Sequence, residues 1–288
     1  MNGIRRPTRV VRRRIIPSMS AREQTPVLHF TECGAGQPPV VLVHGFPLDG
    51  EIFAAQRDAL GAPGRRVLVP DLPGFGRSPP LAEGKPYTIA SLANVLHEAL
   101  HARAALPCVL GGLSMGGYVA LSFARQYPEA LQGLVLIDTR AEADSIEGRQ
   151  ARAAMIEAVR DRGAAAAADQ MLPRLLAEST AHARPEVAKG VRQMIERQPA
   201  ATIIRAIEAI RDREDATPWL SRILTPTLIV VGQHDVITPP SLAEAMRAAL
   251  PTAWMTTIAD CGHLPPVERP EALSDRLVRF LDQVSPAR

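Results

Sequence analysis

The strongest chemical signal in the chain is a serine between glycines, at residues 112–116 (Gly-Leu-Ser-Met-Gly). A serine hydroxyl is a poor nucleophile unless a base takes its proton and the backbone exposes it. These residues follow an apolar run typical of a strand and precede a helical pattern. Flanking glycines permit the sharp strand–turn–helix bend that lifts a serine out of a sheet. Ser114 is therefore the candidate nucleophile.

A candidate base and a candidate acid follow later strands. His263 comes after the last predicted strand and Asp235 after the one before it. A carboxylate in this place can fix the tautomer of the histidine and stabilise the imidazolium. The order serine, aspartate, histidine differs from the orders of chymotrypsin and subtilisin. Asp138, which also follows a strand, is a competing acid. We favour Asp235, because it lies in a turn bounded by glycine and proline and follows the penultimate strand.

A second loop, His44-Gly45-Phe46-Pro47, directly follows another predicted strand. A tetrahedral intermediate needs N–H donors directed at its developing oxyanion. The backbone N–H of Met115, just after the nucleophile, and that of Phe46 are the candidates, since Pro47 has no N–H to donate. His44 is a candidate substrate contact, although a histidine in this position more often braces the loop.

Short apolar runs alternate with helical patterns in most of the chain, which indicates βα units that build a parallel sheet. The predicted strands are 27–30, 40–43, 67–69, 108–110, 134–137, 228–231 and 255–258, and the predicted helices are 52–60, 89–101, 115–126, 241–249 and 271–284. Several strands are continuous Val/Leu/Ile runs, as expected for strands buried on both faces.

Residues 141–220 break this alternation with a purely helical pattern. An insert of this size between two strands is expected to cap the carboxyl edge of the sheet, where ligands bind in open α/β sheets. We therefore predict a core of residues 21–140 and 221–288 with a helical cap at 141–220. The apolar content of the cap favours an apolar pocket, with Met155 and Ile156 as candidate substrate contacts beside His44 and Pro47. The same residues could equally pack the cap onto itself.

Charge is unevenly distributed along the chain. The net charge is +3, but six arginines lie in the first fourteen residues, and the remainder carries 27 basic and 30 acidic residues. The body therefore lacks a nucleic-acid footprint. The arm, residues 1–20, is expected to be a disordered tail, or to precede a true start at Met19. Contact with nucleic acid or an anionic membrane, and a transit peptide, are alternative interpretations.

Composition narrows the remaining possibilities. No apolar run approaches the roughly 18–20 residues that span a bilayer. The three cysteines are far apart and lack metal-site spacing, which favours the cytoplasm. We find no metal cluster, phosphate loop or dinucleotide fingerprint, and we expect no cofactor.

The chain resembles the esterase, enol-lactonase and cofactor-free haloperoxidase branch of the α/β-hydrolase superfamily. The resemblance covers about residues 27–281 and is carried by residues 44–47, 71–78 and 112–117, by Asp235, and by Gly262-His263. It implies a central, mostly parallel sheet with an inserted cap. Haloalkane dehalogenases and epoxide hydrolases of this fold use an aspartate nucleophile, so Ser114 excludes both. Pro47 resembles the residue of members that accept hydrogen peroxide.

These observations predict a serine esterase of the carboxylesterase type that acts on small to medium acyl esters. A lactonase, a carbon–carbon hydrolase, an acyltransferase or a perhydrolase with the same residues is an alternative. A small-molecule receptor that keeps the fold is a hypothesis from a different class. We expect a small-molecule ester as the partner, and the oligomeric state stays open.

Overall fold

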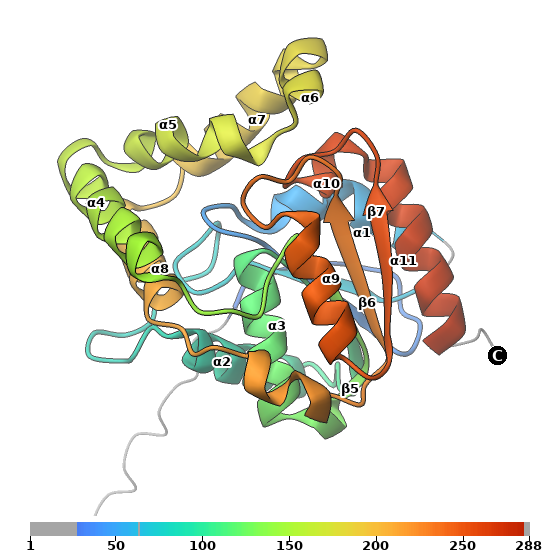
Figure 1. Cartoon of the computed structure of the whole chain (residues 1–288). Coiled ribbons are helices and arrows are strands. Elements are labelled where there is room, and N and C mark those ends of the chain that lie inside the picture. Colours follow the sequence, from blue (N-terminus) through green and yellow to red (C-terminus); the bar gives the residue numbers. More distant parts are fainter. Residues whose placement is uncertain (1–27, 63, 285–288) are drawn as a thin grey trace, which may run out of the picture.

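The computed structural model describes residues 28–62 and 64–284, and this part of the chain contains one seven-stranded sheet (Figure 1). The strand order is β1-β3-β2-β4-β5-β6-β7, with β1 antiparallel to β3 and the other pairs parallel. The strands are β1 (Phe30–Cys33), β2 (Val40–Val43), β3 (Val67–Pro70), β4 (Cys108–Leu113), β5 (Leu131–Ile137), β6 (Thr227–Gly232) and β7 (Ala253–Ile258). The predicted, mostly parallel sheet is confirmed.

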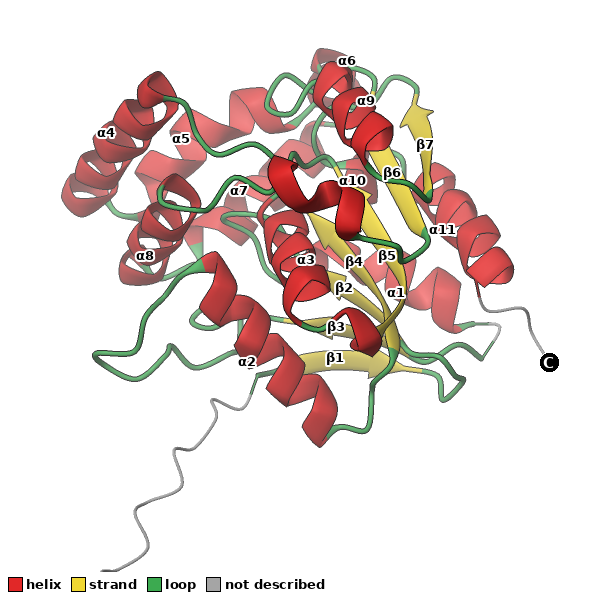
Figure 2. Cartoon of the chain, turned by 60° about the horizontal axis from the view of Figure 1, so that its bottom comes forward, coloured by secondary structure: helices red, strands yellow, loops and turns green. Residues whose placement is uncertain are grey.

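Helices cover both faces of the sheet (Figure 2). On one face α1 packs against α11, and these helices contact β1, β3, β5 and β7. On the other face α2 packs on α3, which contacts β4 and β5, while α9 contacts β6 and β7. Their bounds are α1 (Ala54–Gly61), α2 (Ile89–Ala102), α3 (Met115–Gln126), α9 (Pro240–Ala249), α10 (Pro265–Glu268) and α11 (Pro270–Val284). This cover explains why the central strands consist of apolar residues on both faces.

Between β5 and β6 the chain forms a separate helical layer (Figure 1). It consists of α4 (Ile146–Arg162), α5 (Ala164–Leu175), α6 (Glu178–Ala183), α7 (Pro185–Glu196) and α8 (Ala200–Arg211), followed by a 3₁₀ turn at Thr217–Arg222. Helix α4 packs on α5 and α8, and α7 packs on α5 and α6. Apolar side chains at helical spacing, such as Ile203 and Ile207 on α8, are buried in this layer. Much of its apolar surface therefore stabilises the layer itself.

The bounds of several strands differ from the prediction, and for two of them the cause is clear. The first strand begins at Phe30 rather than at residue 27, because its register is set by antiparallel pairing of Phe30 with Pro70 and of Cys33 with Val67. Its residues are only partly buried, as on the edge of a sheet, so the apolar pattern does not mark it. Strand β4 continues to Leu113 through two glycines, which pair with residues of β2 although glycine has a low strand propensity.

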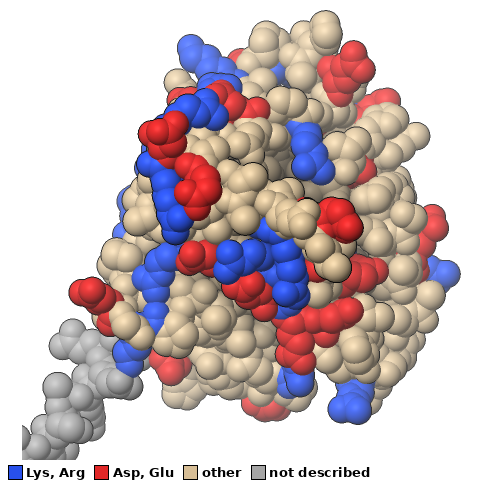
Figure 3. All heavy atoms as spheres, turned by 60° about the vertical axis from the view of Figure 1, so that its left-hand side comes forward, with Lys and Arg blue, Asp and Glu red and all other residues tan. Residues whose placement is uncertain are grey.

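The surface on the side of the inserted helices carries basic and acidic side chains interspersed (Figure 3). Among the described residues, no helix is long and apolar enough to cross a membrane. The arm predicted at residues 1–20 lies outside the described residues.

Candidate active site

Ser114 forms the bend between β4 and α3. Its backbone has φ 51° and ψ −110°, a strained conformation for a residue with a side chain. The bend is tight, since a Cβ atom on Gly112 would lie 2.1 Å from the carbonyl oxygen of Gly116. The Ser114 N–H is held by the Ile137 carbonyl at 2.9 Å, and the Thr139 hydroxyl donates to the Ser114 carbonyl at 2.8 Å. The glycines predicted to permit this turn are thus required by its packing.

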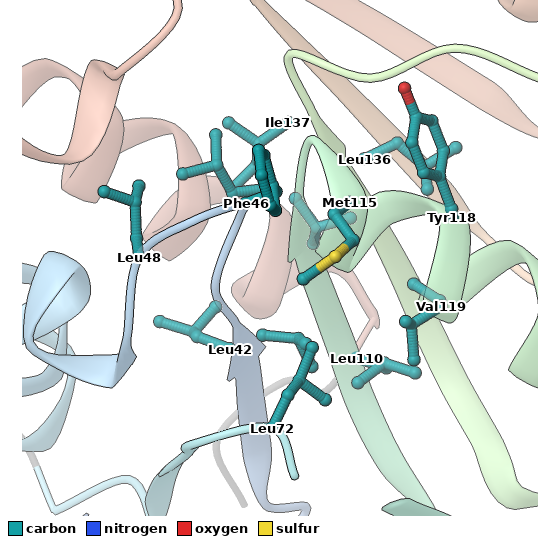
Figure 4. Packing of buried hydrophobic residues seen from close by; sticks show 14 of the residues in the cluster. Leu42, Phe46, Leu48, Leu72, Leu110, Met115, Tyr118, Val119, Leu136 and Ile137 are labelled. Atoms are coloured by element: carbon teal, nitrogen blue, oxygen red, sulfur yellow. The ribbon is translucent and has the colours of Figure 1, made fainter. Parts of the chain in front are cut away.

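The core beneath this bend fixes the residue after the serine. The Met115 side chain is fully buried and points among apolar side chains that include Leu42, Phe46 and Val119 (Figure 4). Because Met115 is the first residue of α3, its N–H has no partner within the helix. That N–H therefore remains available beside Ser114.

His263 and Asp235 lie at hydrogen-bond distance in the loops after β7 and β6. Nδ1 of His263 is 2.7 Å from Oδ2 of Asp235, and both side chains are buried. Burial alone would raise the pKa of Asp235, but the neighbouring His263 and the hydrogen bond from the Thr238 hydroxyl hold it well below its ordinary value. An anionic Asp235 must accept, so Nδ1 carries the proton and Nε2 is free to take another.

The other oxygen of Asp235 anchors its own loop. Oδ1 accepts the backbone N–H groups of Ile237 at 2.8 Å and Thr238 at 3.1 Å. A carboxylate with this many donors is held in one orientation and stays ionised. The turn bounded by glycine and proline thus presents Asp235 to the histidine loop.

Asp138, the competing acid, lies behind Asp235. Its Oδ1 accepts the Gly232 N–H at 2.8 Å, and its Oδ2 is buried with no hydrogen-bond partner among the described residues. Burial first, and then the nearby charge of Asp235, raise the pKa of Asp138 well above its ordinary value. Asp138 is therefore neutral beside the ionised Asp235, because two adjacent buried carboxylates that were both ionised would repel each other strongly.

Glu268, on α10, is a site residue that the sequence analysis missed. Its Oε1 accepts the N–H groups of Gly262 at 3.0 Å and Leu264 at 3.1 Å, on either side of His263. Its Oε2 accepts the N–H of Ala177, from the inserted layer, at 2.8 Å. The only signal in the sequence is an acid within a short, proline-rich apolar run just after the histidine.

The loop after β2 packs against the nucleophile. A Cβ atom on Gly45 would lie 3.3 Å from the Cβ atom of Ser114, and Phe46 lines the same cavity as Ser114. His44, by contrast, is fully buried, and its Nε2 accepts the Leu72 N–H at 3.0 Å. Burial lowers the pKa of His44, so the ring is neutral. His44 braces the loop, and the expectation that it contacts substrate is not supported.

Ser114 opens into a cavity of about 240 Å³ beneath the inserted helices. Met155 of α4, a candidate substrate contact, lines it, but Ile156 and Pro47 do not. Ile156 is one residue further along the helix, so its side chain turns into the buried interior of the layer. The wall of the cavity is also not simply apolar, because Arg140, Asp144, Arg152 and Arg174 contribute to it.

A larger cavity of about 480 Å³ lies next to this one, between α2, α3 and α8. Tyr118 and Arg140 line both cavities, but Ser114 lines only the smaller one. Chemistry at Ser114 therefore concerns the smaller cavity, despite the greater size of its neighbour.

Among the described residues, one group has the spacing of metal ligands: Asp138, Asp235 and His263, whose ligand atoms all lie within 4.8 Å of one another. Two of these residues already contact each other directly, since Nδ1 of His263 lies 2.7 Å from Oδ2 of Asp235, and the Thr238 hydroxyl also donates to that oxygen. That hydrogen bond accounts for the spacing of His263 and Asp235, while Asp138 lies behind them and accepts the Gly232 N–H.

Residues 38–270 match the family model of the alpha/beta hydrolase fold, and the chain belongs to this family. The pimeloyl-[acyl-carrier protein] methyl ester esterase of Xanthomonas oryzae pv. oryzae is 32% identical over 274 residues, which cover 89% of this chain and 100% of the relative. These findings make the chain a hydrolase.

Two solved structures are also similar. A malate-bound thermophilic esterase from Thermogutta terrifontis is 43% identical with a TM-score of 0.85, over 89% of this chain and 93% of that one. The enol-lactonase from Burkholderia xenovorans LB400 is 28% identical with a TM-score of 0.81. The match covers 88% of this chain and 96% of that one. The resemblance to the esterase and enol-lactonase branch, and the predicted fold class, are confirmed.

Proposed function

We propose that the protein is a serine hydrolase of carboxylic esters, with Ser114 as nucleophile, His263 as general base and Asp235 as the acid that orients the base. The observation that carries the proposal is the buried contact of 2.7 Å between His263 and Asp235. Both residues follow parallel strands of the sheet that also presents Ser114. The carboxyl ends of parallel strands meet at one edge, where active sites of open α/β sheets are built.

In the proposed mechanism Ser114 attacks the ester carbonyl while Nε2 of His263 takes its proton. Asp235 holds the opposite ring nitrogen and stabilises the imidazolium that forms. The N–H groups of Phe46 and Met115 stabilise the oxyanion. His263 then protonates the leaving alcohol and activates water, which hydrolyses the acyl-enzyme.

The inserted helices, within residues 141–220, act in this proposal as a cap on the site. Two contacts link them to the loop of His263: the His263 N–H donates to the Leu175 carbonyl at 3.0 Å, and Glu268 accepts from Ala177. A cavity of about 240 Å³ lies below the usual range of roughly 300–1,000 Å³ for ligand sites. This size supports substrates with small to medium acyl groups.

Lactone hydrolysis is the second candidate, favoured by the similarity to the enol-lactonase structure. A lactone is an internal ester, and the same three side chains would open it. Perhydrolysis is a side activity that Pro47 suggests, since peroxide would replace water as the acyl acceptor. A receptor that retains the fold would instead bind a small molecule tightly with little turnover.

One screen tests these options. The protein is assayed with p-nitrophenyl esters of increasing acyl length, with lactones, and with an ester in the presence of hydrogen peroxide. Labelling by a fluorophosphonate probe reports an activated serine independently of substrate choice. Ester turnover and labelling that both disappear in Ser114→Ala support the proposal. Absence of turnover and of labelling in the wild-type protein would overturn it.

A further inference from the structure

The cavity at Ser114 has an excess of positive charge. Of its charged lining residues in the described chain, three are arginines (Arg140, Arg152 and Arg174) and one is an aspartate, Asp144. On the side of the molecule that carries the inserted helices, the surface is hollowed and has basic side chains beside the hollow (Figure 3). Most ligand sites instead combine an apolar wall with a few polar groups.

Asp144 cannot neutralise this wall. Its carboxylate is buried and contacts three guanidinium groups: Arg140 at 2.5 Å, Arg152 at 3.2 Å and Arg213 at 2.7 Å. Arg213 is itself buried, and a buried charge without a partner is strongly destabilising. The Asp144 carboxylate is therefore needed mainly to balance the charge of Arg213. One negative charge is thus shared by three cations, and the two that line the cavity remain under-compensated.

Arg174 adds a further cation from the last turn of α5. It lines the cavity, and among the described residues no carboxylate lies within ion-pair distance of it. The other two arginines come from different segments. Arg140 lies in the loop after β5, and Arg152 lies on helix α4. Three separate segments therefore each contribute an arginine to the wall of one small space beside the nucleophile.

We propose that this arginine wall, formed by Arg140, Arg152 and Arg174, binds a carboxylate on the substrate, so that the preferred substrates are short esters with a free carboxylate, such as monoesters of dicarboxylic acids. The inference rests on the proposed ester hydrolysis. Guanidinium groups match carboxylates geometrically by paired N–H···O bonds. A carboxylate bound there would supply the negative charge that Asp144 alone does not.

The test compares matched substrates. The value of kcat/KM is measured for monomethyl glutarate and for dimethyl glutarate, which differ in the free carboxylate, and their ratio is taken. We expect the wild-type protein to favour the monoester by about tenfold or more, the discrimination that a charge-assisted contact supplies. Arg174→Gln should reduce this ratio by a similar factor, and Arg174→Lys should restore part of it. The Arg174 side chain makes no ion pair in the described chain, so these variants should fold.

Arg160→Gln is the matched control. Arg160 lies on α4 and pairs with Glu157 on the surface, outside the cavity. This variant removes the same charge from the inserted layer and should leave the ratio unchanged. A ratio that falls equally in both variants would show a general field effect and would overturn the local site.

Binding is also measured without turnover. Titration of the Ser114→Ala protein with glutarate and with inorganic phosphate reports anion binding alone. Saturable glutarate binding that weakens in Ser114→Ala/Arg174→Gln supports the inference even if the ester assays fail. Phosphate binding without glutarate binding would overturn the carboxylate assignment. Hydrolysis of neutral esters with no preference for the monoester would overturn the inference while the proposed function stands.

Discussion

Nδ1 of His263 lies 2.7 Å from Oδ2 of Asp235, whereas Asp138 is bonded instead to the backbone N–H of Gly232. The two acids that follow neighbouring strands therefore have different surroundings. Asp235 is surrounded by donors, and Asp138 has one donor and an adjacent carboxylate. This difference determines which of them can stay ionised beside a histidine.

Replacement of the candidate nucleophile should abolish turnover and preserve the fold. Ser114→Ala removes one hydroxyl and keeps a side chain of similar shape at the strained bend. We expect kcat to fall by about 10⁴–10⁶, as for other triads. Steady-state kinetics and fluorophosphonate labelling measure the loss, and circular dichroism checks the fold. Continued labelling of the variant would place the nucleophile elsewhere.

The two acids can be compared by the same isosteric change. Asp235→Asn should lower kcat by up to about 10⁴, because an amide favours the wrong tautomer of His263. Asp138→Asn should change kcat far less, since the asparagine carbonyl can still accept the Gly232 N–H and the native acid is already neutral. The reverse ranking in parallel assays would make Asp138 the orienting acid.

The raised pKa of Asp138 predicts a pH dependence of stability with a definite sign. The folded protein keeps Asp138 protonated, whereas the unfolded chain releases this proton above its ordinary pKa of about 4. Its contribution to stability is thus complete below that pH and is lost as pH rises toward the folded pKa. Asparagine does not titrate, so Asp138→Asn should gain stability relative to wild type as the pH rises above about 4. Denaturant unfolding at several pH values measures the free energy of unfolding of both proteins. A difference between them that does not change with pH would contradict the prediction.

Asp235 should show the opposite trend. Its pKa is lowered by His263 and Thr238, so its contribution is present above the unfolded pKa and is lost as pH falls through the folded one. Wild type should therefore lose stability relative to Asp235→Asn in acid. The same unfolding series includes this variant as an internal comparison.

Glu268 should matter for both stability and rate, because it positions the loop of His263. Glu268→Ala leaves the buried N–H groups of Gly262, Leu264 and Ala177 without their acceptor, at a cost of about 1–3 kcal/mol for each one left unsatisfied. Glu268→Gln retains one acceptor oxygen and should recover part of kcat. The exposed Glu271 on α11 provides the control, and Glu271→Ala should resemble wild type. Equal effects of the two alanine variants would refute this positioning role.

Acyl chain length should affect activity strongly. A small cavity should favour acetyl to roughly hexanoyl esters, with about 0.8 kcal/mol for each buried methylene until the space is full. A series of p-nitrophenyl esters measures this dependence. Activity that keeps rising to palmitoyl esters, with activation at a lipid interface, would indicate a lipase instead.

The sequence alone determined the class of the protein and the identity of the candidate triad. The bend at Ser114 can be predicted from its flanking glycines, because a bend of this type needs them whatever side chains pack nearby. The order of Ser114, Asp235 and His263 is also local information, since each follows a short apolar run that predicts a buried strand.

Only the tertiary structure decided how these residues are supported and what the cavity presents to a substrate. Glu268 joins the adjacent loop of His263 to Ala177, which is 91 residues away in the chain, and no spacing in the sequence reveals that contact. The prediction of an apolar pocket failed to anticipate Arg140, Arg152 and Arg174 because helical periodicity shows which face is apolar, but not which polar side chains border a neighbouring cavity. That depends on how α4 and α5 are placed over the sheet, and long-range packing sets their placement.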